Sequence, residues 1–93
     1  MQTFTFVVDW SGDLGFFYSP VIVASGETEW EARERANEYG TEVFAKELPE
    51  HGITDLFEEN GYVVAVFEGD VTDRLIGDHS VLDARTKLAL IHL

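Results

Sequence analysis

The sequence predicts a single α+β domain, in which one long helix packs on one face of an antiparallel sheet of three or four strands. The N-terminal segment alternates apolar and polar residues with a period of two, which is typical of a half-buried strand. A central segment carries apolar residues at helical spacing behind a capping motif. The length of 93 residues suits one hydrophobic core, so residues 1–93 are expected to form one domain.

The first two strands are expected to form a hairpin. The side of residues 2–10 that faces the core carries Phe4, Phe6, Val8 and Trp10. Residues 11–13 read Ser-Gly-Asp, which is turn chemistry, and residues 14–24 read as the returning strand. Pro20 lacks a backbone donor and therefore marks an edge or a bulge in that strand.

The helix is expected to begin with a capping box, Thr28-x-x-Glu31, and to run to about Leu48, where Pro49 stops it. Gly40 inside the helix predicts a close approach or a kink, because glycine costs roughly 1 kcal/mol relative to alanine there. The stripe expected to face the sheet consists of Ala32, Ala36, Tyr39 and Val43.

Residues 62–68 predict a third strand, which is apolar on both faces and therefore expected to be central, with Val64 and Val66 in the core. The C-terminal segment fits two structures. Ser80 and Asp83 could cap a short C-terminal helix, and residues 87–93 also alternate as a strand would. We favour the helix, whose buried side would carry Val81, Ala84, Leu88 and Ile91.

Composition limits the class of protein. The absence of cysteine excludes thiolate metal or redox chemistry and argues against a disulfide-stapled secreted scaffold. The first residues carry no basic leader followed by an apolar run, and no apolar stretch is long enough to cross a bilayer. We therefore expect a cytoplasmic protein with no membrane association.

No motif predicts catalysis, a metal or a cofactor. Asp78-His79-Ser80 contains the residue types of a hydrolytic triad, but triad members come from separated positions in the chain. Asp70, Asp73, Asp78 and His79 lack the spacing of known calcium and zinc sites. We expect none of these residues to be catalytic or metal-binding, and we predict no cofactor.

The formal net charge of −12 is the outstanding property of the sequence, and its distribution is uneven. Residues 1–70 hold 15 acidic and three basic side chains, whereas residues 71–93 hold three of each. Such a chain is repelled by nucleic acid and attracted to basic proteins. Only six scattered Lys and Arg residues are present, so direct binding to nucleic acid is not expected.

The long helix carries the most informative pattern. Four of its carboxylates recur every three or four residues, so they lie along one face over about 16 Å. Trp30 and Phe44 flank this acidic stripe, and each could either anchor a partner or complete the core. The predicted partner-binding residues are Glu27, Trp30, Glu31, Glu34, Glu38 and Glu42.

The stripe also has a simpler interpretation as a solvated helix face. Two observations favour a function. Like charges at i,i+4 destabilise a helix, and no lysine is interleaved along the stripe to act as a cationic partner. The helix dipole explains acids in the first turn but not Glu38 or Glu42.

Two likenesses accompany these patterns. The order Phe6-Val7-Val8-Asp9, Gly12-Asp13-x-Gly15-Phe16, then Ser25-Gly26-Glu27-Thr28-x-x-Glu31-Ala32 and Ala36 resembles the ββα opening of HicB-type antitoxins over about residues 4–44. The proline-glycine-cysteine turn of that family is absent here, as is room for its C-terminal DNA-binding part. In size and acidity the chain is similar to anti-restriction and some anti-CRISPR proteins, which occupy nucleic-acid grooves.

The expected function is that of a non-enzymatic inhibitor or regulator, which presents the acidic helix to a basic groove of a nucleic-acid-handling protein. The first alternative is an antitoxin-like partner of a basic toxin. The second is a homo-oligomeric structural domain that associates through its neutral, apolar C-terminal segment.

Overall fold

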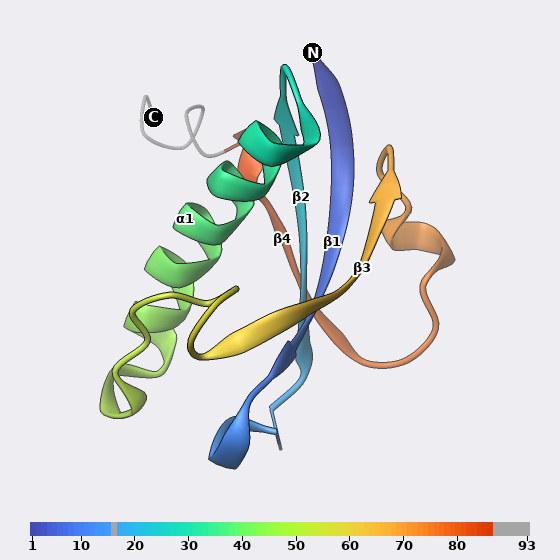
Figure 1. Cartoon of the computed structure of the whole chain (residues 1–93). Coiled ribbons are helices and arrows are strands. Elements are labelled where there is room, and N and C mark those ends of the chain that lie inside the picture. Colours follow the sequence, from blue (N-terminus) through green and yellow to red (C-terminus); the bar gives the residue numbers. More distant parts are fainter. Residues whose placement is uncertain (16, 87–93) are drawn as a thin grey trace.

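The computed structural model describes residues 1–15 and 17–86, which form a four-stranded sheet with one long helix on one face (Figure 1). The α+β class is therefore confirmed. Short 3-10 turns connect several of the elements. In chain order the strands and the helix are β1 (Gln2–Trp10), β2 (Ser19–Gly26), α1 (Glu29–Glu47), β3 (Gly61–Glu68) and β4 (His79–Asp83).

The sheet is mixed, so the prediction of a purely antiparallel sheet is wrong. Its strand order is β3-β1-β2-β4. β1 runs antiparallel to both β2 and β3, whereas β4 runs parallel to β2. The parallel pair arises because residues 69–78 carry the chain from the β3 edge to the far edge, and a crossover of this kind brings a strand back in its original direction.

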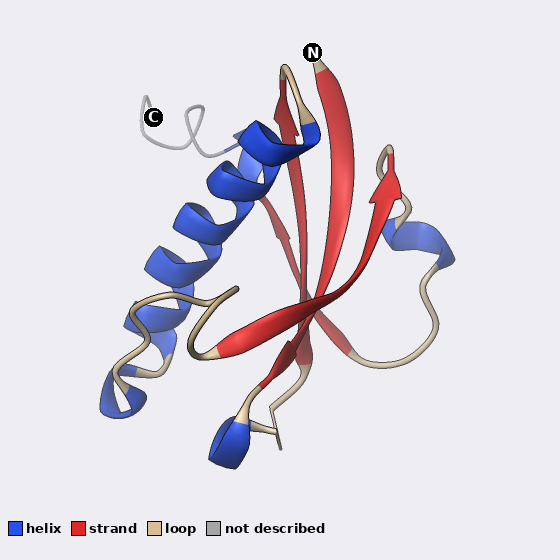
Figure 2. Ribbon diagram, in the orientation of Figure 1, coloured by secondary structure: helices blue, strands red, loops and turns tan. Residues whose placement is uncertain are grey.

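Two crossovers on opposite faces produce this order (Figure 2). α1 connects β2 to β3 over one face, and residues 69–78 connect β3 to β4 over the other. The first crossover runs towards the β3 edge over one face, and the second runs back towards the β4 edge over the other face. Because both the direction and the face are reversed, the two crossovers have the same hand. They leave β3 and β4 at opposite edges of the sheet.

The residues predicted for a C-terminal helix begin instead with a strand. Ser80 lies in β4 opposite Pro20, and Leu82 packs against the core from the position opposite Ile22. A 3-10 turn, Ala84–Thr86, follows β4. The cap at Ser80 is wrong because its segment completes the sheet, and Leu88 and Ile91 lie outside the described residues.

The core lies between the sheet and α1. The prediction for β1 is confirmed, because all four of its core-facing side chains are buried. On α1 the buried residues recur every four positions, so Ala32 and Ala36 are buried as predicted, but Gly40 and Phe44 take the places expected for Tyr39 and Val43. The main core cluster contains Phe4, Phe6, Val8, Trp10, Leu14, Ile22, Ala24, Ala32, Ala36, Phe44, Ile53, Leu56 and Phe57.

β3 is an edge strand, so its predicted central position is wrong. Val64 and Val66 were expected in the core, yet 53% and 36% of their surfaces are exposed. The apolar pattern of β3 is one that central strands usually show. Here β3 pairs with β1 alone among the described strands, because the second crossover takes β4 to the other edge.

Gly40 marks a close approach between α1 and the sheet, as one of the two sequence-based alternatives predicted. A Cβ atom at Gly40 would lie 2.5 Å from Ile22 Cδ1 and 2.7 Å from Leu56 Cδ2. Both neighbouring side chains are fully buried. Glycine therefore lets the helix backbone lie directly on the sheet.

Replacing Phe6 with alanine should lower the free energy of unfolding by about 3–5 kcal/mol, because a fully buried ring would leave a cavity. Chemical denaturation measures this change. The matched control is Val64→Ala on the exposed edge strand, which should stay within about 0.5 kcal/mol of wild type. Equal losses from the two variants would contradict the assignment of the core.

The substitution Gly40→Ala should destabilise the protein, although alanine is the better helix former. The gain of roughly 1 kcal/mol in helix propensity is outweighed by about 1–3 kcal/mol of overpacking against Ile22 and Leu56. Adding Ile22→Val removes the nearest methyl group, so the double variant should be more stable than the two single losses predict. A stabilised single variant, in thermal or chemical denaturation, would show that the helix can move away from the sheet.

Candidate functional site

The outer face of α1 is the candidate site, and local sequence determines where it begins. The Thr28 hydroxyl accepts a hydrogen bond from the backbone N–H of Glu31 at 3.1 Å, as predicted. The Glu31 carboxylate does not serve this cap but pairs with Arg35 at 2.7 Å. The cap starts the helix at Glu29, and this starting point determines on which side of the helix each following glutamate lies.

The structure brings the predicted acidic residues together. At about 100° per residue, the four helical glutamates of the stripe fall within an arc of about 80°. That arc points away from the buried row that begins with Ala32 and Ala36. Glu27, Glu34, Glu38 and Glu42 are exposed, and Glu31 is half-buried.

The two flanking aromatic residues have different environments. Phe44 is buried and packs edge-on against Trp10 with ring centroids 5.1 Å apart, so it completes the core. Trp30 keeps 65% of its surface exposed. It lies one helical turn before Glu34, and so places a large apolar side chain beside the acidic stripe.

The prediction that the stripe lacks cationic partners is wrong. Besides the Glu31–Arg35 pair, Glu42 lies 3.9 Å from Lys46, and both pairs have i,i+4 spacing. Lys46 follows Glu42 in line with the stripe and Arg35 lies one turn after Glu31, so both pairs follow from i,i+4 spacing in the sequence. Each pair is solvent-exposed and therefore worth only about 0.3–0.5 kcal/mol.

The helix nevertheless remains acidic. Glu29–Glu47 contains six glutamates and three cations, which gives a net charge of −3. Arg33, the third cation, turns away from the stripe towards Glu58 at 2.8 Å and lies over the Phe57 ring at 5.3 Å. It therefore anchors the segment before β3 to the helix and leaves the outer face acidic.

Two surface hollows lie between α1 and the β4 side of the sheet. The first, with a volume of about 370 Å³, is lined mainly by aromatic and aliphatic side chains near the C-terminal end of α1, among them Phe17, Phe44 and Leu48. The second, of about 510 Å³, lies between the acidic stripe and the end of β4, because Glu38 and Arg85 both line it. The surface beside the stripe is therefore concave on its β4 side.

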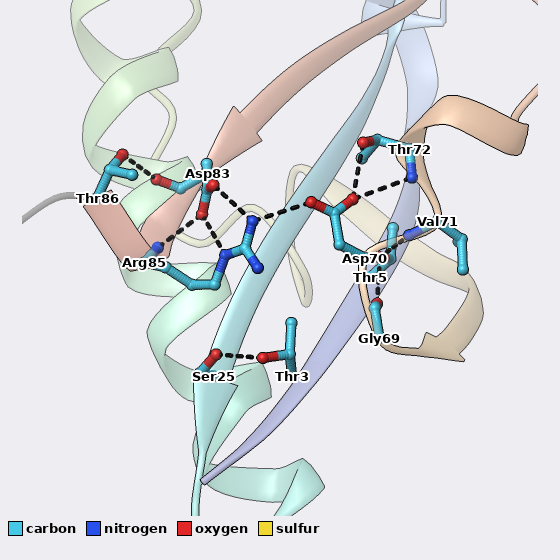
Figure 3. A network of polar contacts seen from close by, with 10 residues as sticks. All are labelled: Thr3, Thr5, Ser25, Gly69, Asp70, Val71, Thr72, Asp83, Arg85 and Thr86. Carbon is cyan, nitrogen blue, oxygen red and sulfur yellow. Dashed lines mark hydrogen bonds and ion pairs between the residues drawn. The ribbon is translucent and has the colours of Figure 1, made fainter.

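One acidic residue of the second crossover, Asp70, belongs to a structural network with Asp83 and Arg85, shown in Figure 3. Asp70 accepts hydrogen bonds from the N–H and the hydroxyl of Thr72, and its other oxygen lies 2.9 Å from Arg85. Arg85 also pairs with Asp83 at 2.8 Å. Behind this pair, the Thr5 hydroxyl donates to the carbonyl of Gly69 at 2.7 Å.

This network accounts for the shifted protonation equilibria. Hydrogen bonds from Thr72 hold the pKa of Asp70 below its usual value of 3.8, and Arg85 adds to the effect. The hydrogen bond from Arg85 likewise lowers the pKa of Asp83, and Asp83 raises the pKa of Arg85. A guanidinium group already occupies the space between the two carboxylates (Figure 3).

The structure does not bring together the four residues considered for a metal site. The Nε2 atom of His79 lies 3.2 Å from the carbonyl oxygen of Ile76, and Asp70 is engaged by Arg85. Within residues 1–15 and 17–86, no group of three acidic or histidine side chains could hold a metal ion.

Sequence inspection missed one exposed feature, the apolar outer strand β3. Its large exposed side chains are Tyr62, Val64, Val66 and Phe67. Their type was visible in the sequence, but the same apolar run is expected of a central strand, so only the strand order reveals the exposure.

Comparisons with known proteins returned no match to a family model, a curated protein or a solved structure. Among the described residues, no helix has both the length and the apolar character needed to cross a membrane.

Replacing Arg85 with glutamine should reduce stability in a pH-dependent manner. Folding lowers the pKa of Asp70 and Asp83. The contribution of these two carboxylates to stability is therefore present above the unfolded pKa of about 3.8, and it is lost as the pH falls through their pKa values in the folded protein. The difference in unfolding free energy between wild type and Arg85→Gln should therefore be largest near pH 7 and should shrink below about pH 4.

Denaturation midpoints at pH 7, 5 and 3 measure this difference. Arg74→Gln is the matched control, because it removes the same charge from an exposed position in the second crossover. A difference for Arg85→Gln that stays constant with pH would contradict the assigned coupling.

Proposed function

We propose that this protein is a non-enzymatic binding protein, which uses the outer face of α1 to occupy a basic nucleic-acid-binding groove on a partner protein. The exposed Trp30 beside the acidic stripe is the observation that supports this proposal best. Tryptophan is enriched among the residues that dominate binding energy, and this one makes no contribution to the core cluster.

Electrostatics support the same partner. A chain with net charge −12 is attracted to a basic protein from a distance, which raises the association rate. The stripe is sparser than a DNA strand, which places a phosphate every ~3.4 Å, but it has the same sign and a linear form. Binding of α1 in such a groove would exclude nucleic acid from it.

The ion pairs on α1 do not oppose this function. Because the Glu31–Arg35 and Glu42–Lys46 pairs are exposed, each costs only about 0.3–0.5 kcal/mol to break. Both carboxylates can exchange their own cation for one on the partner. The two helix cations also limit repulsion within the free protein, which keeps α1 folded before binding.

The position of α1 is well suited to binding as a rigid unit. Ala32, Ala36 and Gly40 allow the helix to lie close to the sheet, and the Thr28 cap fixes its first turn. A preordered helix loses less conformational entropy on binding than a flexible acidic segment would lose.

The test begins with co-purification from the native source and identification of the partner by mass spectrometry. The partner is then bound to fluorescent DNA or RNA, and displacement by this protein is measured at two salt concentrations. Wild type should displace the nucleic acid, and its affinity should fall as salt rises, because screening acts within about 8–10 Å. A partner that binds no nucleic acid would contradict the proposal and favour the antitoxin-like alternative.

The double variant Glu27→Gln/Glu34→Gln should remain folded and bind the partner more weakly, with a smaller dependence on salt. Trp30→Ala should weaken binding by about 1 kcal/mol or more without changing the salt dependence. The matched control is Asp73→Asn/Asp78→Asn, which removes two exposed acids from the second crossover. Equal losses from the helix pair and the control pair would show that only net charge matters.

A further inference from the structure

The edge of β3 that no other described strand covers is the second surface of this molecule with unusual chemistry. A long, exposed and apolar edge strand presents unpaired backbone groups that can bind another strand. β3 is eight residues long, and it carries no charge between Gly61 and Phe67. The opposite edge is better protected, because β4 has five residues and includes His79 and Asp83.

The exposed side chains of β3 lie on both faces of the sheet. Phe67 is paired with Thr5, whose side chain points away from α1, whereas Val66 is paired with Phe6 on the α1 side. Phe67 is 42% exposed and Val66 is 36% exposed. A helix or loop could cover only one of these faces, but an added strand covers both, because its side chains alternate. The exposure on both faces therefore specifies a strand as the occupant.

The charges around β3 specify the chemistry of that strand. Residues 52–73 contain six acidic side chains and no basic one. Glu59 precedes β3 and Glu68 ends it; both are exposed and form no ion pair within residues 1–15 and 17–86. Pairing of β3 with a second copy would bring two such acidic edges together, which is unfavourable.

We propose that the β3 edge binds an extended segment of a partner protein, which has alternating apolar residues and lysine or arginine at both ends. The segment would add a fifth strand to the sheet, with its main chain bonded to β3. Acids flank β3 at both ends, so the terminal cations are satisfied in either strand direction. A bulge in the β1–β3 ladder leaves Val64 without a partner on β1, and the added strand follows the bend there.

This inference goes beyond the proposed function, because the acids that flank β3 by themselves specify the positive charge of the segment. The surface is distinct from the outer face of α1, so each can be tested by its own variants. The probe is a synthetic peptide, acetyl-Lys-Lys-Val-Thr-Val-Thr-Val-Lys-Lys-amide, titrated into the isotope-labelled full-length protein. Nuclear magnetic resonance then reports amide shifts and amide hydrogen exchange for each residue.

The peptide should slow amide exchange in residues 61–68 and shift their signals. A peptide methylated on alternate backbone nitrogens should not bind, because it cannot form the ladder. A peptide with glutamate in place of lysine should bind at least about tenfold more weakly. Protection elsewhere, or equal binding of the methylated peptide, would overturn the strand-addition proposal, and equal binding of the glutamate peptide would overturn the proposed charge.

The closest matched variants are Val64→Lys and Val81→Lys. Both valines are 53% exposed and lie on opposite edge strands. Because each variant replaces valine with lysine, the two changes alter net charge equally. Val64→Lys should weaken peptide binding by about tenfold or more, and Val81→Lys should leave it within about twofold. Equal effects would overturn the assignment to β3.

Two further measurements separate this inference from the proposed function. Glu27→Gln/Glu34→Gln should leave peptide binding at β3 intact even though it weakens binding of the partner to α1. Loss of peptide binding in that variant would place the peptide on α1 and overturn the inference. A concentration-dependent mass that Val64→Lys abolishes would assign the edge to a second copy, and so would also overturn it.

Discussion

The hydrogen bonds of the Thr5 hydroxyl are the interaction on which the arrangement of the sheet depends. Thr5 lies on the central strand β1, on the face opposite α1, and its side chain is fully buried. Its oxygen donates to the carbonyl of Gly69 and accepts from the N–H of Val71. A buried hydroxyl without a partner costs about 1–3 kcal/mol, so these bonds favour a second crossover that begins directly over β1. That path determines which strand reaches each edge.

The two crossovers are held to the sheet by different interactions. α1 covers its face with a broad apolar surface, and the close approach at Gly40 holds it firmly against Ile22 and Leu56. The second crossover has no regular helix longer than one short turn, and its polar contacts include the Thr5 hydrogen bonds and the Arg85 bridge between Asp70 and Asp83. Apolar burial thus holds α1, which carries the acidic stripe, against the sheet. Ion pairs and hydrogen bonds hold the second crossover on the opposite face.

The two proposed surfaces follow from this division. Because the buried row of α1 consists of Ala32, Ala36, Gly40 and Phe44, the glutamate stripe lies on the opposite side of the helix, and Trp30 has no position in the core cluster. Because β4 is carried to the far edge, β3 keeps an apolar edge that none of the other described strands covers. Arg33 connects the two regions through Glu58, so the helix and the segment that leads into β3 are held together. A basic partner could contact both surfaces at once, and the affinity of two linked contacts exceeds that of either contact alone.

Local patterns in the sequence determined most of the secondary structure. Alternation identified β1, the Thr28 motif identified the start of α1, and the apolar run of residues 62–68 identified β3. These features were predictable because they depend on neighbours within a few residues. The acidic face of α1 was predictable for the same reason, since helical periodicity alone places glutamates in a row.

The tertiary structure alone decided the strand order, and with it the exposure of β3. An apolar run has the same appearance whether a strand is central or at an edge, and the sequence around Ser80 suits a helix cap as well as a strand. Local sequence therefore determined which segments are strands and helix, whereas contacts between distant residues, such as Thr5 with Gly69, decided where those segments lie and which surfaces remain open.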